Sequence, residues 1–140
     1  MNEDSTKCSR TVRSAALLAV LLCAAGGRLM AQEAKVTPLM TKELPDIPGK
    51  EGLMLLVEYP PGSKDASHRH NADTFVYVLE GSIVMQLKGQ QPVTLTAGQT
   101  FYEGPEDVHA VGRNASATKP AKFVVLLVKK QGAPALVPAQ

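Results

Sequence analysis

The chain has 140 residues, enough for one domain and too few for two of ordinary size. Hydrophobic residues make up 44% and charged residues 20%, which is the balance of a globular protein and excludes a disordered or fibrous one. The formal net charge is only +2, and no basic cluster follows the N-terminal stretch, so a nucleic-acid-binding surface is not expected.

The N-terminal segment, residues 1–31, has the pattern of a secretory signal peptide. It opens with the basic residues Lys7, Arg10 and Arg13. An apolar stretch of 11 residues follows at 15–25. A membrane-spanning helix needs about 20 apolar residues, so no stable membrane insertion is expected after processing. Cleavage after Ala31, or alternatively near Gly26, predicts a periplasmic or secreted protein.

Two alternatives stay open for this segment. Cys23 is a candidate for lipidation, although the bulky Leu22 stands where a lipoprotein signal takes a small residue, and Arg28 fits an uncleaved anchor. Cleavage after Ala31 removes Cys23 and Cys8, so the mature chain has no thiol for a disulfide or a nucleophile. It also removes four of the 15 basic and two of the 13 acidic residues, which leaves 11 of each and a formally neutral protein.

The rest of the chain predicts strands and no helix. Residues 32–49 form a proline-marked lead-in that disfavours a long helix, with an edge strand expected at 36–40. Further strands are expected at 53–59, 75–80, 82–88, 93–96, 100–103 and 122–130. The first of these is a continuous apolar run, typical of a strand buried on both faces. Short strands between glycine and proline turns predict an antiparallel β-sandwich or barrel.

The chain has only three histidines, and two of them stand one residue apart, at His68 and His70. On a strand, residues i and i+2 project from the same face, with their Cα atoms about 6.6 Å apart. Two imidazoles so placed can converge on one metal ion. Two exposed loop histidines are the alternative, because a His-x-His pair alone is a weak signal.

The surrounding sequence, "PPGSKDASHRHNADTFVYVLEG", resembles the first motif of the cupin family. Gly62, His68, His70 and Gly81 stand in the register of that motif. The sequence "GQTFYEGPEDVHAVGRN" resembles the second motif, with its glycine at Gly98 and its histidine eleven positions later. That histidine is His109, so the resemblance implies that all three histidines are metal ligands.

The resemblance also implies an architecture and an oligomeric state. It implies an all-β, antiparallel jelly-roll β-barrel over residues 50–130, preceded by the signal peptide (1–31) and the lead-in (32–49). Residues 131–140 are expected to form a C-terminal tail that lies loosely on the surface. Cupins commonly dimerise through sheet faces or edges, so a homodimer is expected.

The chain departs from the cupin motifs at one position that matters for chemistry. Thr74 stands where the first motif has a metal-binding glutamate. Glu103 lies six residues before His109 and is the candidate replacement, either as fourth ligand or as catalytic general base. A solvated charge at a strand end is the alternative for Glu103. Thr74 and Tyr102 are candidates for contact with a bound ligand.

The expected function is therefore an exported, single-domain, metal-dependent cupin. The cofactor is a divalent metal (Fe, Mn, Zn or Ni), and the partner is a small organic molecule. Dioxygenase, isomerase and decarboxylase chemistry all fit, since some cupins, the thiol dioxygenases among them, work with three histidines and iron. A non-catalytic binding or sensing module with the same pocket is the alternative function.

Overall fold

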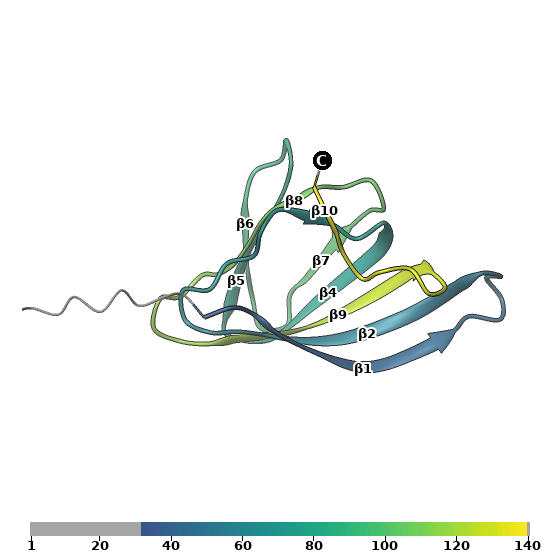
Figure 1. Ribbon diagram of the computed structural model, residues 1–140. Helices are drawn as coiled ribbons and strands as arrows, with labels where there is room; N and C mark the ends of the chain where they lie inside the picture. Colours follow the sequence, from purple (N-terminus) through teal and green to yellow (C-terminus); the bar gives the residue numbers. More distant parts are fainter. Residues whose placement is uncertain (1–31, 140) are drawn as a thin grey trace, which may run out of the picture.

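The computed structural model describes residues 32–139, and all regular structure in this range is β (Figure 1). Its strands are β1 (Lys35–Glu43), β2 (Lys50–Tyr59), β3 (His68–Arg69), β4 (Ala72–Glu80), β5 (Ser82–Leu87), β6 (Val93–Thr96), β7 (Thr100–Glu103), β8 (His109–Asn114), β9 (Ala121–Lys130) and β10 (Val137–Pro138). Within these residues no helix is long and apolar enough to cross a membrane. The expected signal peptide lies outside the described residues.

The strands form two five-stranded antiparallel sheets that face each other. The first sheet has the order β1-β2-β9-β4-β7, and the second has the order β10-β3-β8-β5-β6. In Figure 1 the long strands β1, β2, β9 and β4 run side by side, and β5, β6 and β8 rise on the opposite side of the barrel. This arrangement is the antiparallel jelly roll that the cupin resemblance implies.

The first sheet is the long, regular half of the barrel. Strands β2 and β9 pair without a break from Lys50↔Lys130 to Tyr59↔Ala121. Alternate residues of these strands face the interior, as the period of two of a β-strand requires. The core joins the inward side chains of both sheets; it contains Leu55, Val57, Tyr59, Ala72, Val76, Val78, Ile83, Met85, Leu95, Ala121, Phe123, Val125 and Leu127.

The structure corrects the expectation that β2 is buried on both faces. Leu55, Val57 and Tyr59 are buried, but Met54 and Leu56 on the other face are only half-buried. No described element covers that outer face of the first sheet. The apolar run at 53–59 therefore forms a strand with one face in the core and one apolar face that is half-exposed.

Residues 131–139 also differ from the loose tail that was expected. They leave β9 in the first sheet and cross to the second sheet, where β10 pairs with β3 (Figure 1). Edge-strand pairing satisfies backbone groups that a loose tail would leave to solvent. The segment therefore belongs to the barrel.

The backbone conformation explains why the first motif has a glycine at Gly81. It turns β4 into β5 with φ 71°, in the left-handed region that glycine enters without strain. A Cβ atom there would lie 2.5 Å from the carbonyl oxygen of Pro120. The turn that leads the chain from the first sheet to the second at this corner thus requires glycine.

Candidate metal centre

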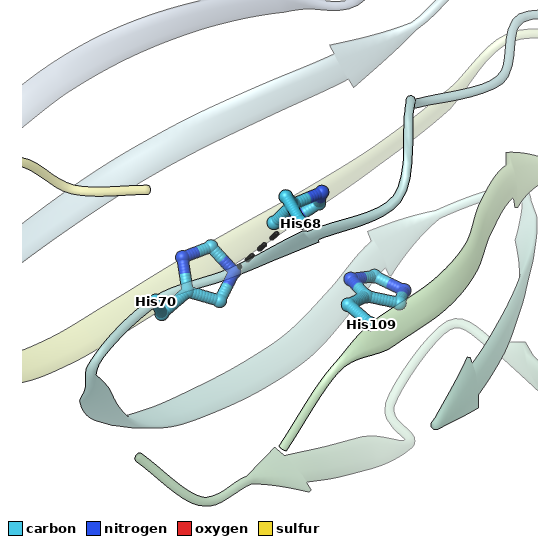
Figure 2. A group of neighbouring side chains, drawn as sticks. All are labelled: His68, His70 and His109. Carbon is cyan, nitrogen blue, oxygen red and sulfur yellow. Dashed lines mark hydrogen bonds between the residues drawn. The ribbon is translucent and has the colours of Figure 1, made fainter. Parts of the chain in front are cut away.

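The three histidines meet at the second sheet, inside the barrel. His68 begins β3, His70 follows that strand directly, and His109 begins β8. His68 and His109 are register partners across the β3–β8 pair. Figure 2 shows the three rings turned toward one another from these strands. One ligand atom from each ring lies within 4.8 Å of the others, which places the three histidines in position to bind a metal ion.

Backbone carbonyls fix the orientation of each ring. The Nδ1 atoms of His68 and His70 lie 2.8 Å from the carbonyl oxygens of Ala66 and Ala135. The Nε2 atom of His109 lies 2.7 Å from the carbonyl oxygen of Val111. A carbonyl oxygen only accepts, so each of these ring nitrogens carries the proton and donates it. This pairing is the usual way in which proteins orient metal-binding histidines.

The remaining ring nitrogens point at one another. The Nε2 atoms of His68 and His70 are 3.2 Å apart, and in neutral rings whose Nδ1 is protonated both carry lone pairs (Figure 2). Two facing lone pairs repel unless a proton or a cation lies between them. Burial lowers the pKa of His70, and lowers that of His109 to about 4, so both of these rings are neutral near pH 7. Neutral imidazole is the form that coordinates metal.

Glu103 completes this group from the first sheet. Its side chain is only 3% exposed, and its Oε2 atom lies 3.4 Å from His109 Nδ1 and 3.8 Å from His70 Nε2. Within the described residues neither Glu103 Oε2 nor His109 Nδ1 has a hydrogen-bond partner. A buried polar atom without a partner is costly, and a divalent cation would satisfy both atoms together with the two Nε2 atoms. The residues present therefore fit a metal ion.

The carboxyl group of Glu103 is also unusual in its acidity. Burial raises its pKa to about 7, helped by the nearby Asp107 and Asp65 carboxylates. An opposite charge close to a carboxylate favours its ionised form. A bound cation would therefore lower the pKa of Glu103, opposite to the effect of burial.

Thr74 lies directly opposite Glu103, as its register partner in the β4–β7 pair. Its side chain is fully buried, and its hydroxyl has no hydrogen-bond partner in the described part of the chain. Thr74 stands at the position that carries glutamate in the first motif. Its side chain and that of Glu103 thus face the same interior. Across an antiparallel pair, opposite side chains have Cβ atoms only about 5 Å apart.

A second polar pair lies in the same interior. The hydroxyl of Tyr59, a residue that is 1% exposed, donates a hydrogen bond to the Asp65 carboxylate. Burial raises the pKa of both groups, and for Tyr59 the Asp65 and Glu103 carboxylates add to the effect. Tyr59 therefore holds its proton and acts as a donor.

Gly112 provides the space for this arrangement. A Cβ atom at this position would lie 2.9 Å from Cε1 of His109 and 3.1 Å from the Tyr59 hydroxyl. The glycine thus allows the imidazole and the phenol to approach the backbone of β8. No positive φ is involved, so close approach is the sole reason that the structure gives for glycine here.

These groups line a cavity of about 450 Å³. Its polar residues are the three histidines, Glu103, Tyr59, Asp65 and Ser67. The rest of its wall is apolar; it includes Val36, Leu55, Val57, Val76, Met85, Phe123, Val125, Leu136 and Pro138. The cavity therefore combines one polar region, lined by the three histidines and Glu103, with a mainly apolar wall, and this combination suits a small organic molecule with an apolar body.

Comparison with known proteins identifies the family. Residues 55–127 match the family model described as Cupin domain, which is more than half of the 140 residues. The chain belongs to the cupin family. No curated protein matches this cupin.

Solved structures agree on the fold. A cupin domain from Bordetella pertussis Tohama I is 23% identical, with a TM-score of 0.54, and the match covers 69% of this chain and 94% of that one. The cupin domain of an XRE family transcriptional regulator from Enterobacter cloacae is 23% identical, with a TM-score of 0.53 and coverages of 69% and 96%. The DMSP lyase DddQ from Ruegeria pomeroyi DSS-3 is 22% identical, with a TM-score of 0.55 over 63% of this chain. This cupin spans 43% of the length of that lyase.

One candidate residue lies away from the site. Tyr102 is 48% exposed on the outer face of the first sheet, where its hydroxyl donates to Asp73 Oδ1 at 2.7 Å. Glu103 is the next residue on β7, and neighbouring residues of a strand point to opposite faces. Because Glu103 points inward, Tyr102 points outward and does not line the cavity. The expected ligand contact through Tyr102 is therefore not available in this cavity.

Sequence reasoning missed Tyr59, Asp65 and Ala135 in this cupin. Tyr59 ends an early strand, far in sequence from His109, and Asp65 lies in the loop before His68. The alternation of Leu55, Val57 and Tyr59 on the inward face of β2 was the available signal for Tyr59. Ala135 acts through its carbonyl, which no side-chain pattern reveals.

Proposed function

We propose that this cupin is a metal-dependent enzyme whose ligands are His68, His70, His109 and Glu103. The convergence of three lone-pair nitrogens and one buried carboxylate oxygen carries this proposal. With Glu103 ionised, the ligand set carries one negative charge, as in cupins with the motif glutamate, although the carboxylate comes from β7. Elemental analysis of the purified protein identifies the metal among Fe, Mn, Zn and Ni. Protein from metal-replete cells that holds none of these ions would contradict the proposal.

The proposed reaction is a proton transfer of the isomerase or decarboxylase type. When bound, the metal ion would act as a Lewis acid toward an oxygen of the substrate. The single hydroxyl proton of Tyr59 is shared with Asp65, so Tyr59 would donate it to the atom on which negative charge develops only when Asp65 is protonated and donates to the phenol oxygen in turn. Burial raises the pKa of Asp65 and so favours that protonated form. Asp65 orients the phenol, and the apolar wall excludes water around the reacting atoms. The buried Tyr59–Asp65 pair supports this class because it places a proton donor in the cavity.

The proposed substrate is a small organic molecule with one anionic or carbonyl oxygen and an apolar body. The polar region of the cavity would hold the oxygen and the apolar wall the body. Metal-loaded protein can be screened against short-chain and aromatic carboxylates in D₂O by NMR. An enzyme of this class incorporates solvent deuterium into a ligand that it binds, or releases carbon dioxide from it. Oxygen consumption without either reaction would assign the site to a dioxygenase.

A non-catalytic binding or sensing module is the second candidate. Its support is the mainly apolar wall of the cavity and the similarity in fold to the cupin domain of a transcriptional regulator. In the same screen, saturable binding with no deuterium incorporation, product or oxygen uptake would favour this role.

We also propose that the protein is exported and cleaved after Ala31, because a basic start precedes a short apolar stretch. A mature chain in the periplasm or medium should begin at Gln32, which mass spectrometry of the intact protein detects. A cytoplasmic chain that retains Met1 would contradict this.

A homodimer is proposed through the outer face of the first sheet. Phe75, Tyr77 and Tyr102 are each about half exposed there, at 47%, 47% and 48%. Clustered exposed aromatic side chains mark protein interfaces. Light scattering after gel filtration measures the state, and Tyr77→Lys should shift a dimer to monomer without loss of metal. A wild-type monomer at every concentration would contradict the dimer.

A further inference from the structure

The segment that follows β9 takes part in the metal centre. This strap (residues 131–139) crosses from the first sheet to the second, where it becomes β10 (Figure 1). Ala135, Leu136 and Pro138 line the same cavity as the histidines. The strap therefore forms one wall of the site and reaches its ligands directly.

Two contacts join the strap to the His-x-His segment. Val137 and Pro138 pair with Arg69 and His68, so β10 is the outer neighbour of β3. The carbonyl oxygen of Ala135 accepts the Nδ1 proton of His70 at 2.8 Å. Without that carbonyl, His70 loses the partner that sets which of its nitrogens is free to coordinate. His68 and His109 take their corresponding bonds from Ala66 and Val111, outside the strap.

A buried lysine anchors the strap to the first sheet. Lys129 is 3% exposed, and its ammonium group contacts both the Glu51 carboxylate and the carbonyl oxygen of Ala133. The backbone amide of Gln131 also donates to the carbonyl oxygen of Gly49 at 2.9 Å. Burying a lysine is costly unless its charge and its protons are satisfied. Here they are satisfied at the point where the strap departs from β9.

The geometry points to the strap as a positioning element of the metal centre, with Lys129 as the residue that holds it in place. This inference rests on the proposed metal site. Lys129 does not touch the site and acts through Ala133, Ala135 and then the ring of His70. Coupling between two binding events is reciprocal, so a metal ion bound to His70 must in turn stabilise the docked strap.

The chain offers a matched control for Lys129. Lys122 lies on the same strand and contacts Glu80 Oε1 at 3.4 Å, but this ion pair is exposed and stands at the start of β9, whereas the strap follows the end of β9. Lys129→Met and Lys122→Met therefore remove the same charge from β9. Only the first one releases the strap, and methionine retains the apolar volume of the lysine side chain at the buried site.

Zinc affinity of the full chain, measured by competition with a chelating dye, tests the positioning role. Removing the partner of a ligating histidine typically costs 10–100-fold in metal affinity. We expect Lys129→Met to weaken Zn²⁺ binding about tenfold and Lys122→Met to change it less than twofold. Imidazole ¹⁵N NMR of the zinc-free protein should show a mixture of His70 tautomers in Lys129→Met, with His109 unchanged. A general loss of stability would move both rings alike.

Hydrogen exchange of the wild-type chain with and without Zn²⁺ provides a test that needs no variant. Zinc should slow exchange of the strap amides at least tenfold relative to those of β6, which is remote from the site. Suppose that zinc binding requires the histidines, but that zinc does not change the exchange of the strap amides and Lys129→Met does not change the zinc affinity. These results together would overturn this inference alone. A wild-type chain that binds no divalent ion would overturn the proposed function and this inference together.

Discussion

Thr74 and Glu103 face each other across the β4–β7 pair, both with buried side chains. One is the position at which the first cupin motif carries its glutamate, and the other carries the carboxylate that reaches His70 and His109. The fold therefore offers two neighbouring backbone positions from which one carboxylate can approach the same point.

A swap of these two residues tests that equivalence. Glu103→Thr alone should reduce metal affinity 10-fold or more, because it removes a ligand. The double variant Thr74→Glu with Glu103→Thr should recover most of that loss, since the carboxylate then approaches from the opposite strand. Zinc titration measures both variants. A double variant that binds no better than Glu103→Thr would show that only the Glu103 position reaches the ion.

Glu103→Gln should have opposite effects with and without metal. The folded-state pKa of Glu103 is raised to about 7, so the buried carboxyl favours its protonated form, and metal-free stability falls as pH rises through that value. Replacing it by a neutral amide should raise the metal-free melting temperature at pH 8, by an amount equivalent to about 1–3 kcal/mol, and change little at pH 5. In excess zinc the same variant should be the less stable one. A variant with equal stability in both states would place Glu103 outside the site.

His109 makes the stability of the metal-free protein depend on pH. Burial lowers its pKa to about 4, so the neutral form is favoured in the folded state. Its contribution to stability is present above the unfolded value of about 6.5 and is lost as pH falls toward 4. Glu103 changes metal-free stability in the opposite direction over this interval, so the contribution of His109 is the difference between the wild type and His109→Gln in thermal melts at half-unit pH steps. This difference should favour the wild type most above pH 6.5 and should shrink progressively toward pH 4.

Tyr59→Phe and Tyr102→Phe compare two tyrosine–aspartate bonds. The first bond is buried in the cavity, and its loss leaves the Asp65 carboxyl without its phenol partner. We expect a destabilisation of about 1–3 kcal/mol, retained zinc binding and lost deuterium incorporation into a bound substrate. The second bond is exposed, and its loss should cost less than about 0.5 kcal/mol and leave turnover intact. Equal turnover in the two variants would remove Tyr59 from the reaction.

Gly112→Ala should damage the site through contact alone. The added methyl group would press on the His109 ring and the Tyr59 hydroxyl. We expect zinc affinity to fall about tenfold, with a destabilisation of about 1–3 kcal/mol from overpacking. Gly52→Ala is the control, because its Cβ would meet nothing nearer than 3.8 Å. Chemical denaturation and zinc titration separate the two effects, and a harmless Gly112→Ala would contradict the close approach.

The sequence was sufficient for the long strands and for the histidines. The apolar runs of β2, β4 and β9 and the turn at Gly81 predict the first sheet, and the motif spacing predicts that His68, His70 and His109 converge. Strands β3 and β8 were not predicted, because one has two residues and the other, "HAVGRN", has no strong β pattern. Their pairing depends on long-range closure of the barrel.

The remaining parts of the site could not be predicted, for two different reasons. Tyr59 meets Asp65 six residues later through an irregular loop whose path no strand pattern specifies, and Ala135 meets His70 across 65 residues of sequence. Local pattern carries no information on such contacts. Local pattern does constrain the orientation of Glu103. Because Glu103 and Tyr102 are neighbours on one strand, only one of the two side chains can face inward.

The two sheets differ greatly in the extent of their pairing, and this difference bears on maturation. Strands β2 and β9 pair over ten residues each, whereas β3 and β10 have two residues each. Short pairings at a sheet edge open more readily than long central ones. We expect the newly made chain to fold around its long strands first and to acquire its ion afterwards, through transient opening of the β3–β10 edge. Once bound to His68 and His70, the ion would stabilise the β3–β10 edge through which it entered. Dissociation of the ion would then be slow even where its equilibrium affinity is moderate.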